Sequence, residues 1–134
     1  MIVADTCLIA SLLLNVPNTP DAEAVLTRDP FWTAPNLWRY EFKNVLATYI
    51  RFAGLSVETA IEVFDKAAEI ILPQNVEIAS AMIIRLASER KLSAYDAEYL
   101  ALAASIDLKL VTLDKGLLKA GAGIAVTPQE AVAR

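Results

Sequence analysis

Acidic residues stand at positions where an α/β fold can bring carboxylates together. Asp5 and Asp114 each follow a short apolar run typical of a buried strand, and Asp96 falls in the first turn of an apolar helix. Ligands of open parallel sheets bind beyond the carboxyl ends of the strands, so these side chains are expected to share one crevice. The chain has no histidine, which leaves carboxylates and a bound divalent cation as the means of catalysis.

A fourth acid, Glu41, lies on a helix predicted over residues 37–52. One face of that helix carries apolar residues at spacings of three and four: Trp38, Phe42, Val45, Tyr49 and Phe52. Glu41 lies beside this stripe and not on the opposite, polar face. Its carboxylate therefore either reaches outward to solvent or serves a site.

Each acid also has a structural explanation. Asp5 can form a turn or a helix cap where its strand ends, and Asp114 can begin a turn before Gly116. Ser93 and Asp96 together resemble a capping box, which places the Asp96 carboxylate near the positive end of a helix dipole. One such acid alone indicates little, but four of them in this order predict a site.

The composition predicts one domain covering residues 1–134. The chain is 56% hydrophobic, yet no apolar run approaches the roughly 18 residues of a membrane span, and we expect a cytoplasmic protein. A net charge of −4 argues against holding nucleic acid by phosphate neutralisation alone. A polyanionic substrate would need a divalent metal for part of the contact. The single cysteine, Cys7, is expected to pack in the core, because no histidine can activate it.

Short strands and helices alternate along the chain. Strands are predicted over residues 1–4, 31–33, 108–113 and 124–126, and helices over 7–14, 21–28, 37–52, 57–71, 76–91, 94–105 and 115–120. Thr6 is expected to cap the first helix and Ser56 the fourth. This alternation predicts an α/β fold with a parallel sheet covered on both faces.

Four motifs in order resemble the PIN domain, and in particular the VapC-type toxin ribonucleases of toxin–antitoxin pairs. They are IVADT at residues 2–6, LWRYEFKNVL at 37–46, YDAEYLALA at 95–103 and LVTLD at 110–114. The resemblance covers essentially the whole chain. It implies a three-layer α/β/α fold whose central parallel sheet has the strand order 3-2-1-4-5, and a metal-dependent endoribonuclease that cleaves RNA phosphodiester bonds with an activated water.

The resemblance also implies roles for single residues. The catalytic acids would be Asp5, Glu41, Asp96 and Asp114. Mg²⁺ or Mn²⁺ would be bound mainly by Asp5 and Asp96, with Asp114 direct or through water, and Thr112 would hold a metal-bound water. Where the family often has a further acid, Lys115 follows Asp114 directly, so the resemblance does not extend to a second metal site.

The implied partners are an RNA substrate, a cognate VapB-type antitoxin and a second copy of the chain in a homodimer, with no membrane. The alternative is a non-catalytic Mg²⁺-binding α/β regulatory domain. A haloacid dehalogenase-type phosphatase would need Asp-x-Asp at the first strand, where this chain has Asp5, Thr6 and Cys7. Neither the RNA target nor the antitoxin's identity is encoded in a motif.

Overall fold

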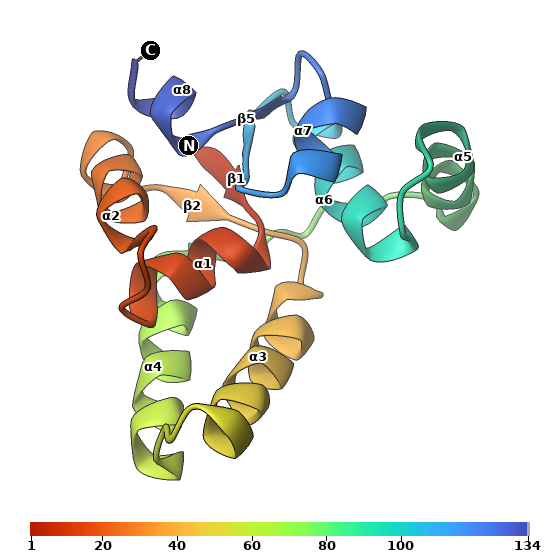
Figure 1. Ribbon diagram of the computed structural model, residues 1–134. Helices are drawn as coiled ribbons and strands as arrows, with labels where there is room; N and C mark the ends of the chain where they lie inside the picture. Colours follow the sequence, from red (N-terminus) through yellow and green to blue (C-terminus); the bar gives the residue numbers. More distant parts are fainter. Residues whose placement is uncertain (134) are drawn as a thin grey trace.

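The computed structural model describes residues 1–133. Its centre is a sheet of short, parallel strands in the order β3-β2-β1-β4-β5 (Figure 1). The strands are β1 (Ile2–Ala4), β2 (Trp32–Thr33), β3 (Ile71–Leu72), β4 (Leu110–Val111) and β5 (Ala125–Val126). The predicted fold class and strand order are confirmed.

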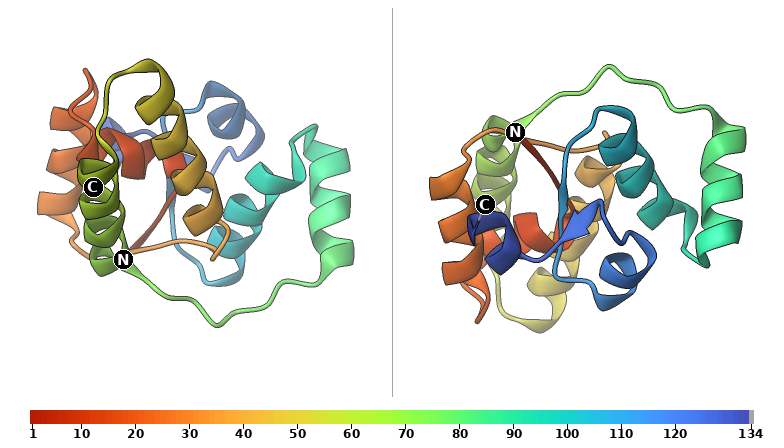
Figure 2. Two further views of the ribbon diagram at one scale, coloured as in Figure 1. Left: turned by 90° about the horizontal axis from the view of Figure 1, so that it is seen from below. Right: turned by 90° about the horizontal axis from the view of Figure 1, so that it is seen from above.

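Helices flank the sheet, and they are α1 (Thr6–Leu13), α2 (Thr19–Arg28), α3 (Trp38–Phe52), α4 (Val57–Ile70), α5 (Ser80–Arg90), α6 (Ala94–Ser105), α7 (Lys115–Ala120) and α8 (Pro128–Ala133). Helices α1, α3 and α4 contact one another. Helix α6 contacts β1 and β4, and α5 packs on α6 at the far side of the molecule (Figures 1 and 2).

The central strands are buried on both faces. Val3, Ala4, Leu110 and Val111 are fully inaccessible to solvent, as is Trp32 on the neighbouring strand. A parallel sheet covered by helices on both sides requires such continuous apolar strands. Each large side chain removed from water in this way contributes roughly 2–3 kcal/mol.

The position of β1 in the sheet explains where a site can form. The chain runs from β1 outward to β2 and β3, and later returns to place β4 on the other side of β1. Such a reversal opens a crevice at the carboxyl ends of the two strands. Val3 pairs with Leu110 and Ala4 with Val111, so the next residues, Asp5 and Thr112, emerge side by side at this crevice.

The segment after α4 differs from the prediction. Ile71 and Leu72, expected to end a helix, form β3, and the helix expected from Val76 begins only at Ser80. Residues 73–79 are extended instead and arch from the sheet edge toward α5 (Figure 2). Seven extended residues span up to about 25 Å, against about 10 Å for the same number in a helix. The extended segment therefore bridges a longer gap than a helix of the same number of residues would.

The buried faces of α3 and α4 are also partly different. On α4 the large residues Val57 and Ile61 are exposed, whereas the small residues Ala60 and Ala67 are buried. At the far end of α3, Phe52 is 74% exposed although it continues the predicted stripe. Small residues on α4 allow close approach to α3, where Phe64 stacks on Trp38 with ring centroids 5.6 Å apart. None of the described helices has the length and apolar run needed to span a bilayer.

Candidate active site

Asp5 is a buried carboxylate held by two hydrogen bonds. It is 5% exposed; its Oδ1 accepts from the backbone N–H of Leu8 at 2.9 Å, and its Oδ2 accepts from the Thr112 hydroxyl. Asp5 thus caps α1, so the prediction that Thr6 is the cap was wrong. Burial raises the pKa of Asp5 from 3.8 to about 6, and the carboxylates of Asp114 and Asp96 add to the increase.

Asp114 is joined to Asp5 through one buried hydroxyl. The Thr112 Oγ1 that donates to Asp5 also accepts from the backbone N–H of Asp114 at 3.0 Å. Asp114 in turn caps α7, because its Oδ1 accepts from the backbone N–H of Leu117 at 3.0 Å. A β-carbon at Gly116 would lie 3.1 Å from that Oδ1, so the glycine leaves room for the carboxylate.

Asp96 is half-buried in the first turn of α6. As predicted, Ser93 caps this helix, and its hydroxyl accepts from the backbone N–H of Asp96 at 3.0 Å. Burial raises the pKa of Asp96, and the charges of Asp114 and Glu41 raise it further, while the Ser93 hydroxyl opposes them. The cap explains the position of Asp96, and the charge effects place its carboxylate within electrostatic range of Asp114 and Glu41.

Glu41 is anchored by two hydroxyls. Its Oε1 accepts from Thr6 Oγ1 at 2.9 Å and from the Tyr99 hydroxyl at 2.7 Å, and the two hydroxyls are themselves 2.8 Å apart. Burial raises the pKa of Tyr99, so the phenol stays protonated. Our sequence reasoning missed Tyr99 as a site residue. Its spacing of three from Asp96 on the same helix, which places both on one face, was the available signal.

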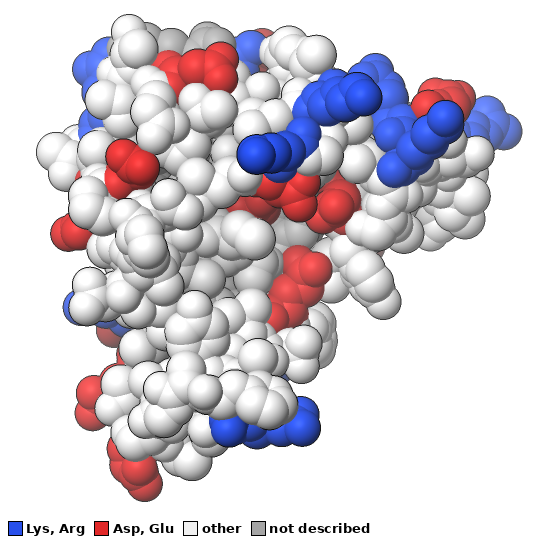
Figure 3. Space-filling model, in the orientation of Figure 1, with Lys and Arg blue, Asp and Glu red and all other residues white. Residues whose placement is uncertain are grey.

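The pKa of the Cys7 thiol is affected by the charges of all four predicted acids. Contrary to the prediction of core packing, its side chain is exposed. The pKa of its thiol is raised to about 11. Loss of hydration is the largest cause, and the charges of Asp5, Asp114, Asp96 and Glu41 contribute in that order. The charges of all four predicted acids therefore reach the start of α1. Figure 3 shows acidic side chains gathered in a hollow of this face, between α3 below and α7 above.

The donor set suits a hard divalent cation. All four acids offer oxygen ligands. Burial is the main cause of the raised pKa values of Asp5 and Asp96, and repulsion by neighbouring carboxylates adds to it; a cation would relieve both. Among residues 1–133, however, no three acidic, histidine or cysteine side chains already surround one point closely enough to be ligands. The assignment of Asp5, Asp96 and Asp114 as metal ligands stays a prediction, and it requires side chains to turn inward around the ion.

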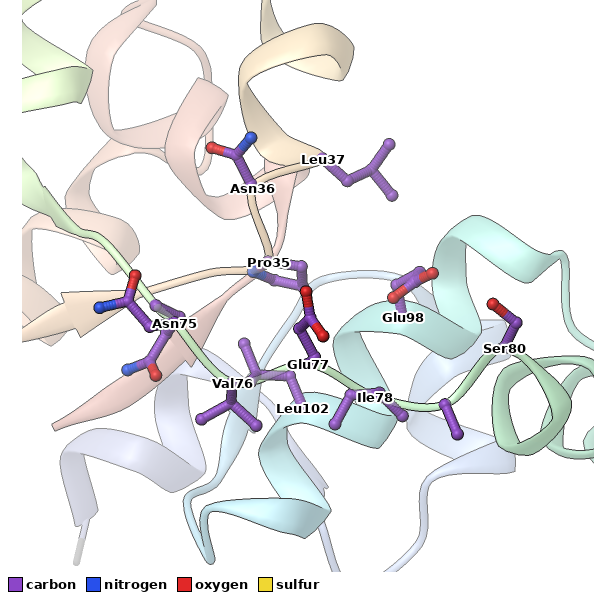
Figure 4. A pocket seen from close by; sticks show the side chains of 12 residues that line it. Pro35, Asn36, Leu37, Asn75, Val76, Glu77, Ile78, Ser80, Glu98 and Leu102 are labelled. Atoms are coloured by element: carbon purple, nitrogen blue, oxygen red, sulfur yellow. The ribbon is translucent and has the colours of Figure 1, made fainter.

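A groove of about 980 Å³ is lined by none of the four predicted acids (Figure 4). Its walls are the extended segment with Asn75 and Glu77, the turn at Pro35 and Asn36, and Glu98 of α6. Glu98, two residues after Asp96, thus belongs to this neighbouring groove.

The geometry describes an α/β protein with an acidic crevice at the switch point of a parallel sheet. The family model of the PIN domain matches residues 2–123 of the chain, and the chain belongs to the PIN domain family. PIN domains are generally nucleases.

Solved structures share the fold. PAE2754 from Pyrobaculum aerophilum superposes with a TM-score of 0.77 at 24% identity, over 99% of this chain and 87% of that one. The structure of FitAB bound to an IR36 DNA fragment superposes with a TM-score of 0.68 at 19% identity, over 96% of this chain and 95% of that one. FitAcB from Neisseria gonorrhoeae superposes with a TM-score of 0.69 at 21% identity, over 96% of this chain and 99% of that one. A search of curated proteins returned no significant match.

Proposed function

We propose that the protein is a metal-dependent endoribonuclease and the toxin of a VapBC-type toxin–antitoxin pair. The observation that carries this proposal is the set of hydrogen bonds that holds Asp5, Asp114 and Glu41, remote in sequence, at the carboxyl edge of the sheet, within electrostatic range of Asp96. Carboxylates that repel one another persist at such a place when a cation offsets their charge.

The ion would be held by Asp5, Asp96 and Asp114. When bound, Mg²⁺ or Mn²⁺ would supply an activated water and offset negative charge at the scissile phosphate. Thr112 orients Asp5 through its hydroxyl hydrogen and fixes the backbone of Asp114 through a lone pair. The water-holding role that the resemblance implies for Thr112 stays a prediction. Glu41, fixed by its two hydroxyl partners, is the acid best placed to orient a water beside the ligands.

The proposed protein partners follow from charge and exposed apolar surface. FitAB was solved with DNA, but a chain of net charge −4 is poorly suited to hold DNA itself. Any DNA contact would belong to a VapB-type antitoxin. Helix α5 exposes Met82, which lines an apolar groove between α5 and α6, and this supports a homodimer through this helix. Met82→Glu should then yield a monomer by light scattering.

The test is incubation of the purified protein with a mixed RNA pool in Mg²⁺, in Mn²⁺ and in EDTA. We expect internal cleavage with either ion, none in EDTA, and none with Asp5→Asn. Asp65→Asn is a matched control, because Asp65 is exposed on α4 and should retain activity. Cleavage that survives in Asp5→Asn or in EDTA contradicts the proposed site. Cation binding by the wild type without cleavage of any RNA would favour the regulatory alternative.

A further inference from the structure

Exposed cations form a band directly above the acidic hollow. We define this basic band as Lys115 and Lys119 on α7 with Arg90 and Lys91 at the end of α5; all four side chains are exposed. The Arg90 guanidinium donates to the carbonyl of Ala120 at 2.5 Å, which ties the end of α5 to the end of α7. Figure 3 shows basic side chains in a row from α7 toward α5, along the rim of the hollow.

The cations of the band are available to an outside anion. Within residues 1–133, Lys91, Lys115 and Lys119 form no ion pair with a carboxylate, although the chain has more acids than bases. Lys115 and Lys119 are four residues apart, so they lie on one side of α7 about 6 Å apart along its axis. Lys115 directly follows Asp114, and the band therefore begins at the acidic cluster.

Other cations near the hollow are differently engaged. On α3, the Arg39 guanidinium lies over the rings of Trp38 and Phe64, at 5.5 and 5.2 Å from their centroids. Lys43 lies over Tyr40 at 4.9 Å from the ring centroid. A cation held against an aromatic face loses part of this stabilisation if it moves to a phosphate. The unstacked lysines of α7 carry no such penalty.

We infer that the basic band binds the phosphate backbone of the substrate RNA where the strand leaves the acidic hollow. The inference rests on the proposed function and adds the direction of the strand, over α7 toward the end of α5. The four carboxylates repel a polyanion, and the cations at one rim offset this repulsion on that side only. Lys115 would contact the phosphate nearest the acids, and Lys119 and Lys91 those farther along.

The experiment measures binding of a short labelled single-stranded RNA in EDTA, so that cleavage does not interfere. The variant is Lys115→Ala with Lys119→Ala. Its matched control is Arg51→Ala with Lys66→Ala, which removes the same charge from the α3–α4 hairpin at exposed positions. Removing one phosphate-binding lysine should reduce the slope of log K against log salt by about 0.7, or by about 1.4 for both lysines, and the double variant should bind roughly 25-fold more weakly at about 0.1 M salt.

The inference is supported if the α7 variant binds this much more weakly and the control binds as the wild type does. It is overturned if the two double variants bind RNA equally, or if polyglutamate displaces RNA as well as unlabelled RNA does, since the band would then bind any polyanion. If the wild type cleaves RNA but its RNA binding does not depend on the lysines, the basic band is rejected as the RNA-binding surface and the nuclease proposal stands. If RNA binding depends on the lysines but no RNA is cleaved in Mg²⁺, the nuclease proposal is rejected and the basic band stands as an RNA-binding surface.

Discussion

Replacing Asp5 by asparagine should stabilise the metal-free protein while it removes the proposed activity. Burial and the neighbouring carboxylates raise the pKa of Asp5 from 3.8 to about 6. The folded state therefore binds the proton more tightly than the unfolded chain does. The stability that protonated Asp5 contributes is fully present below about pH 4. It is lost as the pH rises through about 6, because the buried carboxyl group must then ionise.

The magnitude follows from the two pKa values. A difference of about 2 corresponds to roughly 3 kcal/mol of stability lost to ionisation at neutral pH. Asparagine never ionises, and its carbonyl can still accept from the Leu8 N–H. Its amide faces the Thr112 hydroxyl less favourably than a carboxylate does, which costs about 1 kcal/mol. The net gain of about 2 kcal/mol should raise the melting temperature by roughly 5–10 °C for a domain of this size.

The assay is thermal unfolding in EDTA across the pH range, with Asp65→Asn as the control for removal of an exposed charge. The Asp5→Asn curve should lie above the wild type at about pH 8 and meet or fall below it at about pH 4, where Asp5 is protonated. Added Mg²⁺ should stabilise the wild type more than the variant and narrow the gap at high pH. An Asp5→Asn protein less stable than the wild type at about pH 8 in EDTA would refute the reasoning.

Other consequences can be measured separately. The Cys7 thiol, with its pKa raised to about 11, should react slowly with a disulfide reagent at about pH 8 and faster once Mg²⁺ neutralises the carboxylates; an unchanged rate would mean that no ion binds beside it. Tyr99→Phe removes the hydroxyl that holds Glu41 and should lower the free energy of unfolding in urea by about 1–2 kcal/mol and reduce cleavage, whereas a fully active variant would exclude this positioning role. At Gly121, an added β-carbon would lie 2.8 Å from Leu100 Cδ1, so Gly121→Ala should destabilise by about 1–3 kcal/mol; a neutral effect in urea would show that the α7–β5 turn can shift.

Local patterns in the sequence predicted much of this protein. Ser56 and Ser93 cap their helices as expected, and the apolar run at Leu110 and Val111 is a strand. These features depend on side chains a few residues apart, and neighbouring residues alone determine them.

The tertiary structure decided the rest. Ile71 and Leu72 continue the apolar period of α4, and only the open edge of β2 makes them a strand. Residues 73–79, predicted to be helical from Val76, instead run extended from the sheet edge to α5. The raised pKa of Asp5 likewise comes first from its burial and then from the charges of Asp114 and Asp96, more than ninety residues away in the chain. Sequence order predicted which acids would be present, but burial and mutual repulsion exist only after the sheet has brought them together.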